Sequence, residues 1–167
     1  MTAYKFLTAD GLGVFSRFSW PLPNRGPGAW VESNVEPCQA GIHACRRIDL
    51  PYWLAPALYE IELDGLVDQQ PMKIVAPRGR LLRRIDEWDP DAQEAYGKMC
   101  VARAHELVAA APDRLGSWAP GSKVAPEEAA RLGFVVARIA EELDGVSGYA
   151  NERRRQSEWL VGRLALD

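Results

Sequence analysis

LYEIELDG, residues 58–65, is the stretch of sequence that decides the fold of the first half of the chain. Apolar side chains alternate in it with Glu60 and Glu62, and this period of two is typical of a strand that buries one face. The alternation favours a solvated face for the two glutamates over acid–base catalysis. Asp64-Gly65 adds a turn signal at the end of the stretch.

Short β-rich segments separated by turn residues extend on both sides of this strand, from Ala3 to about Trp88. We expect Met72 to Ala76 and Leu81 to Ile85 to be its neighbours in a sheet. The segment from Asp49 to Leu54 predicts a short helical turn between strands, with Pro51 near its start.

After Trp88 the apolar period changes to that of helices. Asp89 is suited to cap a first helix that begins at Pro90. A second helix is expected from Pro126 to Gly145, and a third from about Ser147 to Leu164. Polar residues interrupt the apolar stripe of the third helix, so we expect this helix to be half-buried, with the aliphatic stem of Arg153 along apolar surface. The predicted inward stripes are Tyr96, Cys100, Ala104, Leu107 and Ala111; Ala129, Leu132, Val136, Ile139 and Leu143; and Tyr149, Arg153, Gln156, Leu160 and Leu164.

Length and composition favour one globular domain over residues 1–167, because a chain of this size fills a single core efficiently. Apolar residues make up 47% and charged residues 26% of it, which separates it from disordered chains. The predicted fold class is α+β. Residues 1–88 form a strand-rich half with a small, twisted, mixed or antiparallel sheet, and residues 89–167 form a half with about three helices.

Charge and hydropathy exclude several classes of function. A net charge of −3 provides no general attraction to nucleic acid. The sequence contains no apolar run of membrane-spanning length and no apolar secretory segment near its start, so we expect a cytoplasmic protein without a membrane partner. A protein partner remains open.

Three cysteines, an odd number, favour thiols or metal ligands over a disulfide framework. If residues 41–45 form a strand, His43 and Cys45 share one face, and with Cys38 they could hold three corners of a zinc site. Either Cys100 or His105 would have to supply the fourth ligand. The alternatives are packed cysteines beside a hydrogen-bonded histidine, or a catalytic pair in which His43 lowers the pKa of Cys45.

A run of basic residues that contains no acid could bind phosphate groups, since arginine presents a planar fork of donors. The alternative is an edge strand whose charges keep it soluble and unpaired. The run consists of Lys73, Arg78, Arg80, Arg83 and Arg84.

The segments from Pro37 to Ala76 resemble a family of small bacterial and phage domains. Shared features are a Cys-x-x-Gly-[hydrophobic]-His-Ala-Cys segment at residues 38–45, an aromatic turn at residues 51–53, a strand ending in acid-Gly at residues 59–65, and Lys-[hydrophobic]-x-Ala at residues 73–76. The resemblance covers about half the chain, and the family has no established activity that it could imply.

The same region is more distantly similar to the ADP-ribosyltransferase superfamily. Its Gly-[hydrophobic]-Tyr strand looks like Gly41-Ile42-His43, its nicotinamide-stacking tyrosine like Tyr52, and its later amphipathic strand like residues 60–63. Residues 4–6 lack the histidine that holds the NAD ribose there, and His43 replaces the central tyrosine. The strand that carries the catalytic glutamate is replaced by helices after residue 88. The resemblance therefore implies a sheet and a ligand cleft rather than a transferase activity.

We therefore expect a cleft, lined by His43, Tyr52 and Trp53 with Arg17 for phosphates, that binds an NAD-like nucleotide. The alternative is a non-catalytic interaction or regulatory module, with or without a stabilising zinc ion at Cys38, His43 and Cys45.

Overall fold

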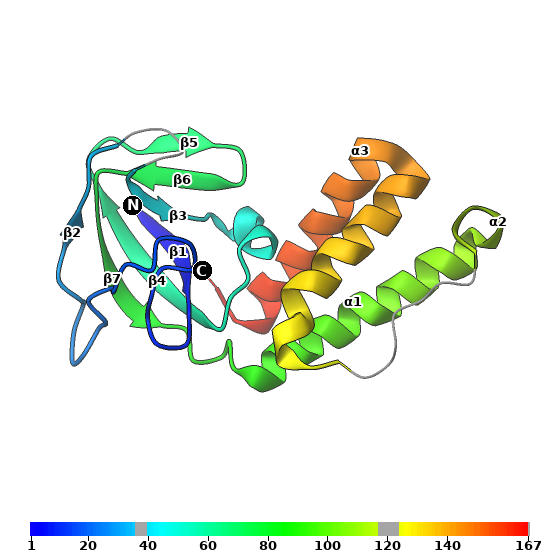
Figure 1. Cartoon of the computed structure of the whole chain (residues 1–167), viewed down its shortest axis with the longest axis horizontal. Coiled ribbons are helices and arrows are strands. Elements are labelled where there is room, and N and C mark those ends of the chain that lie inside the picture. The colour runs from blue at the N-terminus through cyan, green and yellow to red at the C-terminus, as the bar shows by residue number, and fades with distance from the viewer. Residues whose placement is uncertain (36–39, 117–123, 167) are drawn as a thin grey trace. The chain divides into compact units, whose positions relative to one another are not determined.

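The computed structural model describes residues 1–35, 40–116 and 124–166, and it confirms the α+β class (Figure 1). Contacts divide the chain into two compact units, Met1–Trp88 and Asp89–Asp167, here called the strand unit and the helical unit. Their boundary lies where the sequence predicts the change from strands to helices. That both halves belong to one domain stays a prediction.

The strand unit contains two antiparallel sheets, where the sequence predicted one mixed or antiparallel sheet. The four-stranded sheet has the order β1-β4-β7-β2, and the three-stranded sheet the order β3-β6-β5. In the first sheet the strands are Thr2–Leu7 (β1), Ala57–Asp64 (β4), Arg78–Arg84 (β7) and Val31–Glu32 (β2). In the second they are Ile42–Ala44 (β3), Lys73–Ala76 (β6) and Asp68–Gln70 (β5). All three predicted strands are present to within a few residues, and β7 is a neighbour of β4 as predicted, but β6 is not, because it pairs with β3 and β5 in the other sheet.

One isolated bridge between Tyr4 of β1 and Cys45 links the two sheets. It has two backbone hydrogen bonds, from the Tyr4 amide to the Cys45 oxygen at 2.9 Å and from the Cys45 amide to the Tyr4 oxygen at 2.8 Å. Both sheets contribute to one apolar core, and along β7 and most of β4 buried residues alternate with more exposed ones because one face of each strand lies against that core. The core cluster consists of Ala3, Leu7, Trp20, Ile42, Ala44, Ala57, Tyr59, Ile61, Leu63, Ile74, Ala76 and Leu81.

Two glycines allow the tight geometry around the second sheet. Gly65 has a φ of 86° in the turn after β4, where its amide donates to the Asp64 carboxylate at 2.9 Å. Gly41 has a φ of 126°, and a Cβ there would lie 2.5 Å from a methyl carbon of Val75. The glycine of the Cys-x-x-Gly segment is thus required by backbone conformation and by close approach to β6.

The expected helical turn after β3 is a 3₁₀ helix, η1, over Arg47–Tyr52. It begins earlier than predicted, so Pro51 lies near its end rather than near its start. The Arg46 guanidinium pairs with Asp49 at 2.6 Å and donates to the backbone oxygen of Gln70 at 3.0 Å. Arg46 therefore holds the start of η1 against β5.

The basic run is divided between two strands, Lys73 on β6 and the arginines on β7, and neither is the outermost strand of its sheet, although β2 pairs with β7 only at Arg78 and Gly79. Each of its arginines lies within ion-pair distance of a carboxylate. Arg80 pairs with Glu62 at 2.7 Å and Arg83 with Glu60 at 2.6 Å. The acids and bases that the sequence presented as two separate motifs therefore form cross-strand pairs, so neither motif provides an unpaired cluster of charge.

The helical unit contains α1 (Pro90–Ala110), α2 (Pro112–Leu115), the 3₁₀ helix η2 (Pro126–Glu128) and α3 (Ala129–Arg163). Asp89 caps α1 as predicted, accepting from the Ala92 amide at 2.8 Å. α3 is interrupted at Asp144 and Gly145, whose backbone is not helical. This interruption confirms the predicted separation of a second helix from a third.

The two parts of α3 fold back on each other (Figure 1). The Gln156 amide donates to the backbone oxygen of Gly133 at 3.0 Å, although these residues would be about 35 Å apart along an uninterrupted helix. Gln156 also accepts from the Tyr96 hydroxyl of α1 and from the Arg153 guanidinium, each at 3.0 Å. Arg153 is thus buried whole in a polar network, whereas the sequence suggested only a buried stem.

Among the described residues, no helix combines the length and apolar character needed to cross a membrane.

Candidate functional site

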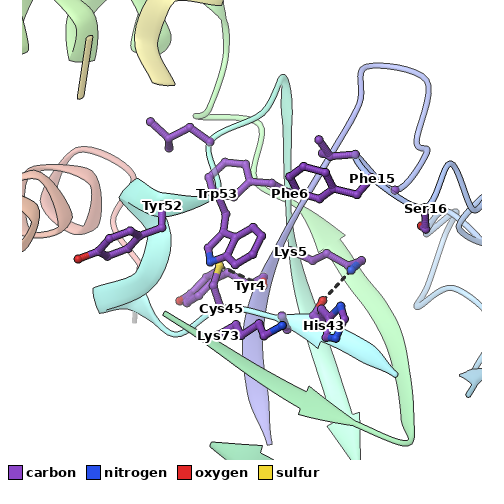
Figure 2. A pocket seen from close by; sticks show the side chains of 14 residues that line it. Tyr4, Lys5, Phe6, Phe15, Ser16, His43, Cys45, Tyr52, Trp53 and Lys73 are labelled. Atoms are coloured by element: carbon purple, nitrogen blue, oxygen red, sulfur yellow. Dashed lines mark hydrogen bonds between the residues drawn. The ribbon is translucent and has the colours of Figure 1, made fainter. Parts of the chain in front are cut away.

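A pocket of about 200 Å³ in the strand unit brings together His43, Tyr52 and Trp53 (Figure 2). It is formed by β1, the turn that follows β1, β3, η1 and the start of β6. Arg17, the fourth predicted ligand residue, does not line it. Arg17 comes directly after the turn that lines the pocket; its side chain is exposed and its backbone φ is 57°. The lining residues are Tyr4, Lys5, Phe6, Gly13, Val14, Phe15, Ser16, His43, Ala44, Cys45, Tyr52, Trp53, Leu54 and Lys73.

Lys5 occupies a position on β1 that alternation assigns to the apolar core. Ala3 and Leu7, two residues before and after it, belong to the core cluster, as does Tyr59, its partner on β4. The Lys5 ammonium donates to the backbone oxygen of His43 at 2.6 Å and lies 4.7 Å from the centre of the Trp20 ring. Burial lowers the pKa of Lys5 from 10.5 to about 8, because an apolar environment disfavours the charged amine.

His43 and Lys73 are the other residues of the pocket whose side chains carry a titratable nitrogen. The Nε2 atom of His43 is buried and has no hydrogen-bond partner among the described residues. Burial, followed by the positive charges of Lys73 and Lys5, lowers the pKa of His43 below its ordinary value. The imidazole is therefore neutral near pH 7 and can accept a proton. Lys73 has no carboxylate within ion-pair distance in the part of the chain that the structure describes.

Aromatic rings form the apolar wall. Trp53 and Phe15 meet edge to face, with ring centres 6.2 Å apart, and the Trp53 indole nitrogen donates to the backbone oxygen of Met72. This bond fixes the indole plane. Phe15 is 82% exposed, so its ring is available to a ligand. In Figure 2 the Tyr52 ring points away from Lys5 and His43, while Trp53 lies on their side of the pocket.

Cys45 lies in the pocket lining as a buried thiol. It donates to the backbone oxygen of Tyr4 at 3.3 Å, and burial raises its pKa well above the ordinary value of a thiol. A cysteine nucleophile needs the thiolate form, so this environment disfavours that role and agrees with the packed-cysteine alternative. The third zinc ligand, Cys38, lies outside the described residues. Among those described, no group of three or more histidine, cysteine or acidic side chains is placed to hold a metal.

Sequence reasoning missed Lys5 and Phe15, and it named Lys73 only as part of the basic run, not as a member of this pocket. A signal for Lys5 was present, because it interrupts the apolar side of a strand that runs from Ala3 to Leu7, and such violations of pattern concentrate at functional sites. No comparable signal marks Phe15, which lies in a turn.

Comparisons of the chain with models of known protein families, with curated proteins and with solved structures find no match.

Proposed function

We propose that the strand unit binds a small anionic ligand of the nucleotide type in the pocket around Lys5, His43 and Trp53. The observation that carries this proposal is a pair of lysines, Lys5 and Lys73, that line an aromatic-walled pocket without a carboxylate partner in the described part of the chain. Buried or half-buried cations normally have an anion beside them. An anionic group of a ligand would supply the negative charge that the described part of the chain does not place beside Lys5 and Lys73.

The size of the pocket limits the ligand. About 200 Å³ is below the roughly 300–1,000 Å³ of pockets that enclose drug-sized molecules. One planar ring with an anionic substituent therefore matches the pocket better than a complete dinucleotide such as NAD. The ring would lie against Trp53 and Phe15, and the anionic group near Lys73.

The ADP-ribosyltransferase resemblance gives the stacking role to Tyr52 instead, and the two assignments can be separated by titration calorimetry with AMP and NAD. We expect Trp53→Leu to weaken binding by about 1 to 3 kcal/mol, the scale of stacking on an aromatic ring. Tyr52→Leu serves as the matched variant and should weaken binding by less than about 0.5 kcal/mol. Weaker binding in the Tyr52 variant alone would favour the assignment made from the resemblance.

A folded wild-type protein that binds neither AMP nor NAD at millimolar concentration would refute the proposal. The second candidate, a protein-interaction module, would then be favoured by a group of exposed apolar side chains in the segment between β1 and β2. These are Val14, Phe15, Phe18 and Leu22.

A further inference from the structure

We propose that Lys5 is a reactive amine that forms a reversible imine with an aldehyde or ketone ligand carrying a planar ring and an anionic group. This deepens the proposed function and rests on it, since it names the chemistry of a ligand held in the same pocket.

The position of Lys5 carries the inference. Its amine is at the margin of an apolar core, beside the Trp20 ring, and is held by one hydrogen bond to the His43 backbone oxygen at 2.6 Å. Figure 2 shows the amine directed toward His43 within the residues that line the pocket. The hydrogen bond uses a proton of the amine and leaves its nitrogen lone pair available to a bound carbonyl carbon.

The surroundings raise the unprotonated fraction of the Lys5 amine. Among the described residues Lys5 has no ion pair with a carboxylate, and the titratable groups that line the pocket with it include His43, Lys73 and Cys45, whose buried thiol is uncharged. A desolvated lysine without a counter-ion is the form that reacts with carbonyl compounds. The lowered pKa described above agrees with this geometry.

The proposed step is balanced within the pocket. The Lys5 nitrogen attacks the carbonyl carbon, a carbon–nitrogen bond forms, and the carbonyl oxygen leaves as water with the two protons that the nitrogen loses. The unpartnered Nε2 of His43 is the neutral base that passes a proton from nitrogen to oxygen. No oxidant or reductant takes part.

Four lysines in the whole sequence make the test site-specific: Lys5, Lys73, Lys98 and Lys123. The wild-type protein is incubated near pH 7 with pyridoxal 5′-phosphate, a probe with a ring, a phosphate and an aldehyde. Borohydride then reduces any imine to a stable secondary amine, and peptide mapping locates it. We expect labelling of Lys5 to exceed that of Lys98 by at least about tenfold, because Lys98 pairs with Glu94 on α1, whereas the Lys5 amine lies in an apolar pocket without a counter-ion.

Two variants sharpen this result. Lys5→Arg keeps the positive charge but cannot form an imine, so labelling at the pocket should be lost, whereas Lys98→Arg should leave labelling of Lys5 unchanged. Equal labelling of Lys5 and Lys98, or labelling mainly at Lys73, in wild-type protein would overturn the inference.

Pyridoxine 5′-phosphate, which has an alcohol in place of the aldehyde, separates this inference from the function on which it rests. If it binds by calorimetry and Lys5 is not labelled by the aldehyde, the imine is refuted and the binding pocket stands. If it does not bind and AMP does not bind, while Lys5 is not labelled, both proposals are refuted.

Discussion

Gly133→Ala is expected to destabilise the helical unit, although alanine is the better helix former. A Cβ at residue 133 would lie 2.5 Å from the Tyr96 hydroxyl oxygen and 3.2 Å from two carbons of its ring. Tyr96 is fully buried and donates to Gln156, so its ring cannot move without breaking that bond. Overpacking costs about 1 to 3 kcal/mol, and a buried group left without its partner costs a similar amount.

Against these costs, replacing glycine with alanine in a helix gains about 1 kcal/mol. The net expectation is therefore a loss of about 1 to 5 kcal/mol, measured by urea denaturation of the whole chain followed by circular dichroism. Gly162→Ala is the matched control, because a Cβ there would meet nothing within 4 Å in the described part of α3 and its surroundings. This control should be as stable as wild type or slightly more stable.

A double variant identifies the clashing atom. In a Tyr96→Phe background the hydroxyl oxygen is absent, so Gly133→Ala should cost less there than in the wild-type background. If Gly133→Ala were as stable as Gly162→Ala, the close approach of α3 to Tyr96 would be refuted, and with it the packing that sets the buried network.

Three further predictions follow from burial. Leu132 is 4% exposed and lies against Gly97 of α1, so Leu132→Ala should lower the free energy of unfolding by about 2 to 5 kcal/mol. A decrease below about 0.5 kcal/mol in urea denaturation would place this side chain in solvent. Burial raises the pKa of Cys45, and that of Cys100 to about 12, so both thiols should react with a thiol reagent only after unfolding; rapid reaction of either in folded protein would contradict this. For Lys5 the pKa falls from 10.5 in the unfolded chain to about 8. Between pH 8 and 10.5 the unfolded chain therefore binds more protons than the folded one, so the contribution of Lys5 to the free energy of unfolding rises with pH. Thermal melts over this pH range should show a smaller rise in melting temperature for Lys5→Met than for wild type.

Local sequence patterns were sufficient to predict elements whose burial or capping depends on residues close by in the sequence. The alternation in residues 58–64 predicted β4 because the strand buries one side against the core and exposes the other. Asp89 and Pro90 located the start of α1, and Gly145 the break in α3, because capping depends on a few neighbouring residues.

The division into two sheets could not be predicted in this way. It depends on which strands pair, such as β3 with β6 through Ile42 and Ala76, residues far apart in the sequence, and strand pairing at that distance leaves no local pattern. For the same reason the acidic and basic motifs looked like separate candidates, whereas the register of β4 and β7 pairs Glu62 with Arg80.

The sequence by itself determined the α+β class, the change from strands to helices at residue 88 and three members of the pocket, His43, Tyr52 and Trp53, because a strand followed by an aromatic turn keeps such side chains close. Only the tertiary structure decided that Lys5 and Lys73 join them and that Arg17 does not. A lysine becomes desolvated and loses its counter-ions through the elements that fold around it, and these elements come from β1, β3 and β6, which are distant in sequence and meet only in the folded protein.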